Sequence, residues 1–133
     1  MSTARSQRPL VAIVDDDPDG RELLATILGL KGFAVEQFES AEAALEALPG
    51  LAPAIIVTDV TLPDMDGYAF GERVRRSEAL RGIPLVALTG RPRDEVDGKG
   101  ALFADVITKP ADPDHVVHAL RRLVVAGTNG GHR

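Results

Sequence analysis

The chain contains no cysteine, so disulfide bonds, thiolate metal sites and cysteine nucleophiles are excluded. It also lacks any run of about 18 consecutive apolar residues, the minimum for a transmembrane helix. Residues 1–9 carry two arginines, but the apolar stretch of a signal peptide does not follow them. We therefore expect residues 1–9 to be an N-terminal extension of a cytoplasmic protein without a membrane partner.

The chain has no excess of positive charge, because its formal net charge is -5. Surfaces that bind nucleic acid are normally basic, so we expect no direct contact with nucleic acid. With 44% hydrophobic and 26% charged residues, the composition is typical of a folded globular protein. A length of 133 residues fits a single hydrophobic core and leaves no room for a second domain.

Short apolar runs alternate with segments of helical spacing along the chain. The runs that predict strands are residues 10–14, 33–38, 54–57, 83–88 and 106–107. Most of them lack polar alternation, as in strands covered on both faces, whereas residues 33–38 are typical of an edge strand. Helix starts are predicted where an aspartate precedes a proline, at Asp17 and at Asp112.

Two segments give weaker signals. Residues 91–100 contain proline and glycine and predict only a short, weak helix between the fourth and fifth strands. Residues 127–133 are polar and glycine-rich and predict a disordered tail. The folded domain is therefore expected over residues 10–126. Its five-fold strand and helix alternation predicts an α/β fold with an open, doubly wound parallel sheet of five strands.

Polar residues follow the strands at the edge where such sheets bind ligands. They are Asp15, Asp16 and Asp17 after the first strand, Asp59 after the third, Thr89 after the fourth and Lys109 after the fifth. Two carboxylates about 4 Å apart repel by roughly 4 kcal/mol at an effective dielectric constant near 20, so the cluster needs a cation. Oxygen ligands without cysteine favour Mg²⁺. Mg²⁺ and Lys109 together would neutralise a phosphoryl group in transfer and leave one carboxylate free to attack it.

Four sequence runs carry a resemblance to a known family: VAIVDDD, VTDVTLPDMDGY, PLVALTG and ITKP. In order and spacing they resemble the receiver domains of two-component response regulators, over the chain from about Leu10 to Ala126. The resemblance implies a flavodoxin-like (β/α)5 fold with strand order 2-1-3-4-5. It also implies that a histidine kinase or a histidine phosphotransfer protein donates a phosphoryl group and that the aspartyl phosphate changes contacts with a downstream protein target. We expect a monomer or weak dimer.

The same resemblance assigns a role to each matching position. Asp59 is the phosphoryl acceptor, and Asp15 and Asp16 are the acidic pair that binds Mg²⁺ with it, Asp16 being the more direct ligand. The backbone carbonyl of Thr61 completes the metal shell. The supporting hydroxyl and ammonium groups are those of Thr89 and Lys109.

Val106 departs from the family pattern. It lies three residues before Lys109, where the family usually carries the tyrosine or phenylalanine that moves inward on phosphorylation. Val106 therefore occupies the switch position, and the sequence does not predict the usual aromatic readout.

Other functions stay open at this point. The chain could be the receiver module of a hybrid histidine kinase or a pseudo-receiver that is never phosphorylated. A small Mg²⁺-dependent phosphohydrolase would need an acidic residue two positions after its nucleophile, which Asp15 and Asp17 supply, and then Thr or Val where Asp19 stands. We favour a signalling module that assists its own phosphorylation and dephosphorylation but is not an enzyme acting on a free substrate.

Overall fold

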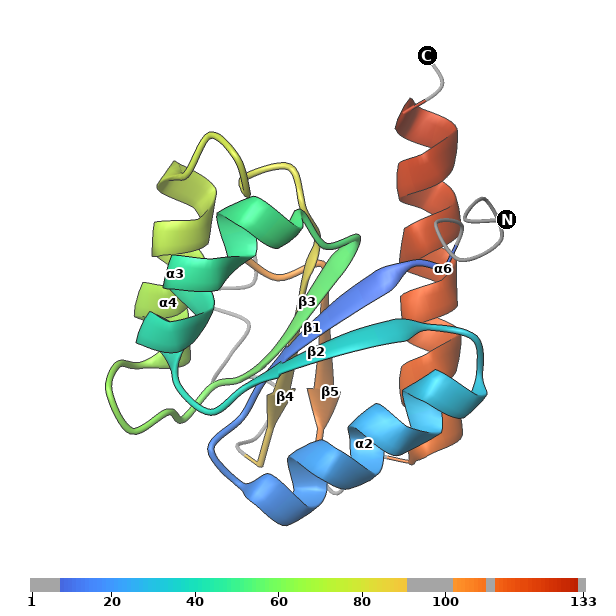
Figure 1. Cartoon of the computed structure of the whole chain (residues 1–133), viewed down its shortest axis with the longest axis horizontal. Coiled ribbons are helices and arrows are strands. Elements are labelled where there is room, and N and C mark those ends of the chain that lie inside the picture. Colours follow the sequence, from blue (N-terminus) through green and yellow to red (C-terminus); the bar gives the residue numbers. More distant parts are fainter. Residues whose placement is uncertain (1–7, 91–101, 110–111, 132–133) are drawn as a thin grey trace.

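The computed structural model describes residues 8–90, 102–109 and 112–131. Residues 91–100, for which the sequence predicted a weak helix, all lie outside this part, so that prediction stays untested. Strands and helices alternate along the described chain, except that the strands at residues 85–89 and 105–108 have no described α-helix between them (Figure 1). They are β1 (Leu10–Val14), α2 (Pro18–Leu30), β2 (Ala34–Phe38), α3 (Ala41–Leu51), β3 (Ile55–Asp59), α4 (Gly67–Arg76), β4 (Leu85–Thr89), β5 (Asp105–Thr108) and α6 (Pro113–Gly131).

Gly90 directly follows β4 and is the last residue described before residues 91–101, which lie outside the described part.

The five strands form one parallel sheet in the order β2-β1-β3-β4-β5, which confirms the predicted topology. β1 lies inside the sheet, and its Val11 is in register with Val35 of β2 on one side and Ile55 of β3 on the other. The chain leaves β1 in one direction to form β2 and returns past β1 to form β3. The strand order therefore reverses between β1 and β3, which is where open α/β sheets bind their ligands.

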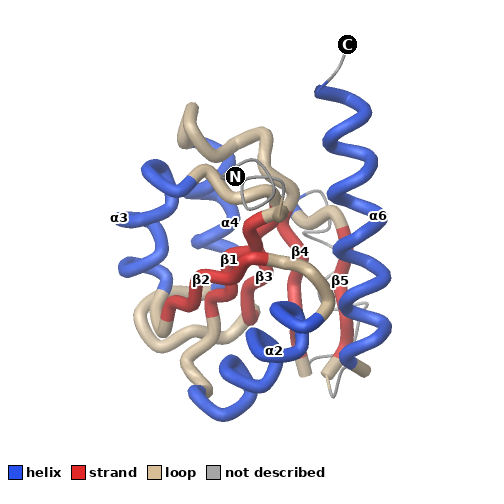
Figure 2. Tube along the Cα trace, turned by 45° about the vertical axis from the view of Figure 1, so that its right-hand side comes forward, coloured by secondary structure: helices blue, strands red, loops and turns tan. Residues whose placement is uncertain are grey.

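Helices cover both faces of the sheet, with α3 and α4 on one side and α2 and α6 on the other (Figures 1 and 2). Side chains alternate along each strand, so Ala12 and Val14 pack in the cluster under α3 and α4. Val11 and Ile13 pack in the cluster under α2 and α6. Burial on both faces explains why β1 has an unbroken apolar sequence.

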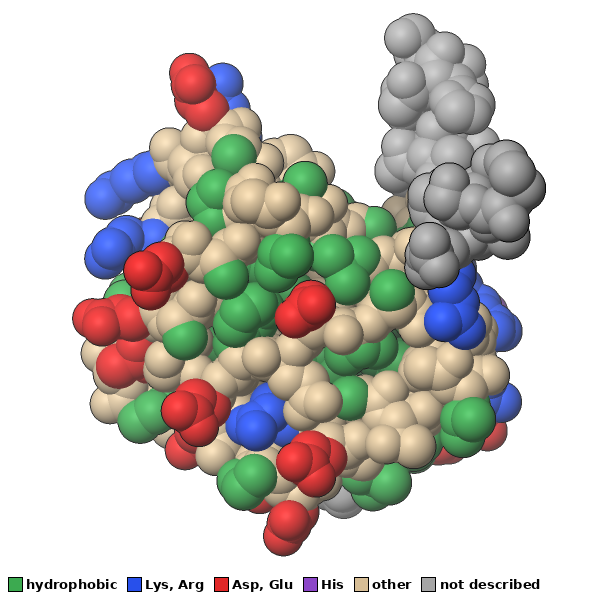
Figure 3. Space-filling model, in the orientation of Figure 1, with side chains coloured by type: hydrophobic (Ala, Val, Ile, Leu, Met, Phe, Trp, Pro, Cys, Tyr) green, Lys and Arg blue, Asp and Glu red, His purple; other side chains and the backbone are tan. Residues whose placement is uncertain are grey.

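β2 is the exposed edge of the sheet, as its mixed sequence predicted. Glu36 and Gln37 are exposed, while Ala34, Val35 and Phe38 are half-buried. Figure 3 views this face and shows apolar side chains gathered over its middle, with acidic side chains around them. An acidic residue on an edge strand also disfavours pairing with a second sheet.

α6 is longer than the sequence predicted. It begins at Pro113 behind the Asp112 carboxylate, which accepts a hydrogen bond from the Asp114 amide at 3.0 Å, and it continues to Gly131. The backbone of residues 127–131 is therefore helical in place of the first part of the expected disordered tail, because each residue added to an existing helix gains one hydrogen bond. Residues 132–133 lie outside the described part. None of the described helices combines the length and apolarity needed to cross a bilayer.

Candidate functional site

The predicted site residues lie at the carboxyl edge of the sheet because each directly follows or ends a strand. Asp15 follows β1, Asp59 ends β3 and Lys109 follows β5. Backbone hydrogen bonds fix Asp15 and Lys109 to the neighbouring strands. The Asp15 amide donates to the Phe38 carbonyl at 3.0 Å, and the Lys109 amide donates to the Thr89 carbonyl at 2.7 Å. The rigid sheet thus carries these side chains to one place.

Three carboxylates converge at this edge. One oxygen from each of Asp15, Asp16 and Asp59 lies within 4.8 Å of the other two. Asp15 is buried, Asp59 is half-buried and Asp16 is exposed, so the cluster opens toward solvent on the Asp16 side. The Lys109 ammonium lies 2.9 Å from Asp59 Oδ2 and 3.6 Å from Asp15 Oδ2.

The electrostatics of this cluster are unbalanced, because one ammonium group faces three carboxylates. Burial raises the pKa of Asp15, and the charges of Asp59 and Asp16 add to this effect, against the Asp17 amide and Lys109, which lower it. Burial lowers the pKa of Lys109, but the hydrogen bond and charge of Asp59 outweigh it, so the pKa is raised overall and the ammonium stays charged. A set of carboxylate oxygens with uncompensated negative charge could bind a divalent metal ion, and its chemistry suits a hard ion such as Mg²⁺.

The segment between β3 and α4 is held against Asp59. The Thr61 amide donates to Asp59 Oδ1 at 3.0 Å, and the Gly67 amide donates to the Val60 carbonyl at 2.7 Å. A Cβ atom on Gly67 would lie 2.6 Å from Val60 Cα and 2.7 Å from the Asp59 carbonyl oxygen, so only glycine allows this approach. The contact of the Thr61 amide does not show whether the Thr61 carbonyl binds a metal ion, so this role stays a prediction.

Asp64 links the same segment to α3, a contact that sequence reasoning missed. Its two carboxylate oxygens accept hydrogen bonds from the amides of Ala41 and Glu42, at 3.1 and 2.8 Å. Desolvation raises the pKa of Asp64, but backbone hydrogen bonds from Glu42 and Ala41, with those of Asp64 and Met65, hold it below its usual value. Ser40 is the N-cap residue of α3, and its hydroxyl oxygen accepts a hydrogen bond from the Ala43 amide at 3.2 Å. The first three amides of α3 are therefore all bonded.

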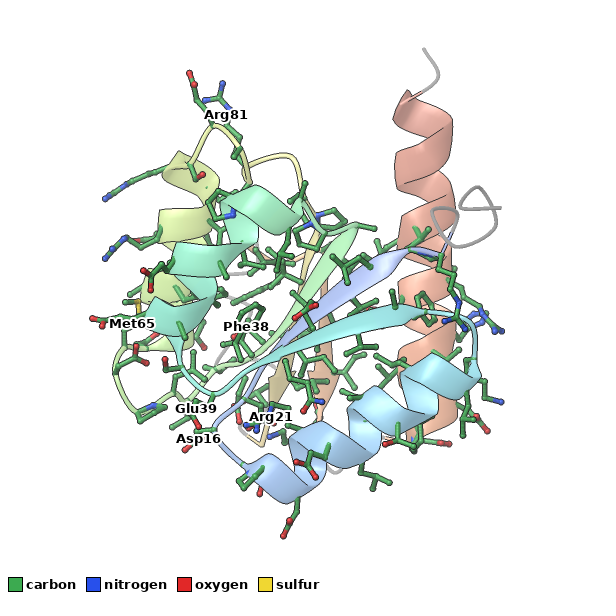
Figure 4. All side chains as sticks on the ribbon, viewed as in Figure 1. Asp16, Arg21, Phe38, Glu39, Met65 and Arg81 are labelled. Carbon is green, nitrogen blue, oxygen red and sulfur yellow. The ribbon has the colours of Figure 1, made fainter. Side chains whose placement is uncertain are left out.

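Arg21 was also missed, since nothing in its local sequence marks it. It lies on α2 and donates from Nη1 to the Asp15 carbonyl oxygen at 2.7 Å and from Nε to Gln37 Oε1 at 3.1 Å. Figure 4 shows Arg21 at the same corner of the molecule as Asp16 and Glu39. The loop after β1 is therefore supported from both α2 and β2.

Thr89 and Val106 are both buried in the interior. Thr89 ends β4 with 1% of its surface exposed, and Val106 on β5 is buried in the cluster under α3 and α4. An aromatic pair occupies that cluster, with the rings of Tyr68 and Phe103 6.0 Å apart and inclined by 57°. Tyr68 is thus a packing residue, whereas the switch role of Val106 stays a prediction.

A groove of about 490 Å³ lies beside the carboxylates, between α2 and α6. Asp15 and Lys109 line one part of it, so it is continuous with the acidic cluster. The remainder is mostly apolar and is lined by Leu23, Leu24, Ile27, Leu88, Pro113 and Val116.

Similarity to known proteins covers nearly the whole folded region. The family model "Response regulator receiver domain" matches residues 11–121. The chain is 37% identical over 119 residues to the "Uncharacterized 14.6 kDa protein in sodA1 3'region" of Leptolyngbya boryana, covering 87% of this chain and 90% of that protein. It is 36% identical to the transcriptional regulatory protein FixJ of Rhizobium meliloti, covering 84% of this chain and 55% of FixJ. The chain thus spans about half the length of FixJ and, at 49%, of the Synechocystis regulator RpaA.

Solved structures agree with the sequence comparisons. The signal receiver domain of a histidine kinase from Syntrophus aciditrophicus is similar with a TM-score of 0.80 and 32% identity, covering 89% of this chain and 91% of that one. The chemotaxis response regulator CheY4 of Vibrio cholerae is similar with a TM-score of 0.82 and 26% identity, covering 88% of this chain and 99% of CheY4. With the match over residues 11–121, these similarities show that the chain belongs to the family of response regulator receiver domains.

Proposed function

We propose that the chain accepts a phosphoryl group on Asp59 from a phosphorylated histidine of a histidine kinase or a phosphotransfer protein. The observation that carries this proposal is the environment of the Asp59 carboxylate, which lies with Asp15 and Asp16 and is paired to Lys109 at 2.9 Å. The aspartyl phosphate then changes the contacts that the domain makes with a downstream protein.

The carboxylates of Asp15, Asp16 and Asp59, with the Thr61 carbonyl, would hold Mg²⁺. When bound, Mg²⁺ supplies positive charge for the phosphoryl oxygens and so lowers the barrier to attack by a carboxylate. The fit rests on the donor set, which consists of oxygen atoms only, and on the excess of negative charge in the cluster.

Each neighbouring residue has a task in the transfer step. A carboxylate oxygen of Asp59 attacks phosphorus, the bond from phosphorus to the donor imidazole nitrogen breaks, and that nitrogen keeps the electron pair. The Lys109 ammonium, already 2.9 Å from Asp59, bonds to an equatorial phosphoryl oxygen. The Thr89 hydroxyl bonds to another, and the Thr61 amide keeps the Asp59 carboxylate oriented.

The groove between α2 and α6 is the proposed docking site for the phosphodonor protein. The donor must bring a phosphohistidine to Asp59, so its surface has to cover the adjoining part of this domain. The groove meets this requirement because Asp15 and Lys109 line it and because Leu23, with 61% of its surface exposed, offers an apolar contact beside them.

The proposal holds equally for a separate regulator and for the receiver module of a hybrid histidine kinase. The similarities include a receiver domain of a histidine kinase and full-length regulators that are about twice as long as the matched region. No observation favours the phosphohydrolase alternative, which would use Asp15 as its nucleophile.

Labelling with acetyl phosphate tests the proposal without the donor protein. We expect the wild-type chain to take up one phosphoryl group when Mg²⁺ is present and none when the metal is chelated. Asp59→Asn should not be labelled, and the control Asp19→Asn, on the exposed first turn of α2, should be labelled as wild type. Undiminished labelling of Asp59→Asn would exclude Asp59 as the acceptor.

A further inference from the structure

Arg21 supports the loop that carries two of the three clustered carboxylates. Its side chain is half-buried, and it donates to the Asp15 carbonyl oxygen at 2.7 Å and to Gln37 Oε1 on β2 at 3.1 Å. Planar guanidinium groups suit this task because their donors point in fixed directions. One side chain therefore joins α2, the end of β1 and the edge strand β2 (Figure 4).

The carbonyl that Arg21 binds belongs to the peptide unit between Asp15 and Asp16. Because this unit is planar, a hydrogen bond to its oxygen restrains the whole plane and with it the direction in which the backbone enters Asp16. The preceding peptide is restrained as well, since the Asp15 amide donates to the Phe38 carbonyl at 3.0 Å. The Asp15 backbone is therefore held on both sides.

Asp16 depends on this support more than the other two carboxylates do. Asp59 is held by Lys109 at 2.9 Å and by the Thr61 amide at 3.0 Å. Asp16 is exposed, and within the described part of the chain no hydrogen bond or ion pair holds its carboxylate. The direction of the Asp16 side chain is consequently set by its backbone.

We propose that Arg21 is a positioning residue for the divalent-cation site, which orients the peptide between Asp15 and Asp16 so that the Asp16 carboxylate faces the other two. The inference rests on the proposed function, because it requires Mg²⁺ to bind at this cluster. The positive charge of Arg21 would by itself have the opposite effect, since it repels a nearby cation. The sign of the change in Mg²⁺ affinity on removing Arg21 therefore separates positioning from charge.

The test is a titration of the full, isotope-labelled chain with MgCl₂, followed by the backbone amide shifts in NMR spectra. We expect Arg21→Met to weaken Mg²⁺ binding roughly tenfold, the lower end of the range for residues that orient metal ligands. The control Arg73→Met removes the same charge from an exposed position on α4 and should change the affinity by less than about twofold.

Gln37→Met provides a second arm that keeps the Arg21 charge and removes only the acceptor of its Nε donor. Gln37→Met should weaken Mg²⁺ binding by about threefold. If Arg21→Met does not fold, the Mg²⁺ affinity of Gln37→Met alone tests the positioning role. Wild-type affinity or tighter binding in both variants would overturn the positioning role and leave the proposed function intact. If the wild-type chain itself shows no Mg²⁺-dependent shifts at millimolar concentration, the proposed function and this inference fail together.

Discussion

Gly67 offers the sharpest test of how the segment after Asp59 is built. A Cβ atom at this position would lie 2.6 Å from Val60 Cα, 2.7 Å from the Asp59 carbonyl oxygen and 2.8 Å from the Val60 carbonyl oxygen. All three are backbone atoms, so no side chain can rotate away. Gly67→Ala must therefore shift the start of α4 or the end of β3.

The cost follows from two contributions. Overpacking of this kind costs about 1–3 kcal/mol, and weakening the 2.7 Å hydrogen bond from the Gly67 amide to Val60 costs about 1 kcal/mol. Replacing glycine offsets roughly 0.4–1 kcal/mol by restricting the unfolded chain. We expect a net loss of about 2 kcal/mol in the free energy of unfolding, measured by urea denaturation with the slope m unchanged.

Gly71→Ala on the same helix is the matched control. A Cβ atom on Gly71 would lie 3.6 Å from the nearest atom of Leu102, which is ordinary contact, so alanine should stabilise the helix interior by roughly 0.5–1 kcal/mol. Gly67→Ala should also slow labelling by acetyl phosphate because it displaces the Asp59 backbone. Equal urea midpoints for the two variants would refute the reasoning.

Two further changes probe the carboxylates and the groove. Burial raises the pKa of Asp15, so the charged form of Asp15 destabilises the folded protein above that pKa. Asp15→Asn should therefore raise the urea midpoint of the metal-free protein at neutral pH. This gain should shrink as the pH falls toward 3.8, the ordinary pKa of aspartate. A gain that does not vary with pH would contradict this cause. Leu23→Asp should slow transfer from the phosphodonor protein about tenfold while labelling by acetyl phosphate stays unchanged. Leu30→Asp, at a position 82% exposed on the same helix and outside the groove, is its control, and equal transfer rates for the two variants would exclude the groove as the docking site.

The sheet and the acidic cluster could be predicted because their signals are local in sequence. An apolar run such as Leu10–Val14 reports burial on both faces, and the acidic residues that follow it come at the edge where parallel strands end. Asp59 and Lys109 also lie at the ends of strands, so the correct fold class was enough to predict that their side chains lie close together.

The supporting contacts could not be predicted because they join positions far apart in the chain. Arg21 meets Gln37 across 16 residues, and Asp64 meets Ala41 across 23. The local sequence around Arg21 and Asp64 indicates only an ordinary helix or turn position. Their partners come within hydrogen-bonding distance only in the folded chain. The end of α6 was missed for a related reason, since glycine and polar residues favour disorder locally but can extend a helix that is already packed.

Identification of the modified residue tests the central claim most directly. The chain is treated with acetyl phosphate and Mg²⁺, borohydride then converts any aspartyl phosphate to homoserine, and peptide mass spectrometry locates the change. We predict homoserine at position 59 alone, and only when Mg²⁺ was present. Homoserine in place of Asp15 or Asp16, or an equal yield at Asp59 without Mg²⁺, would contradict the account.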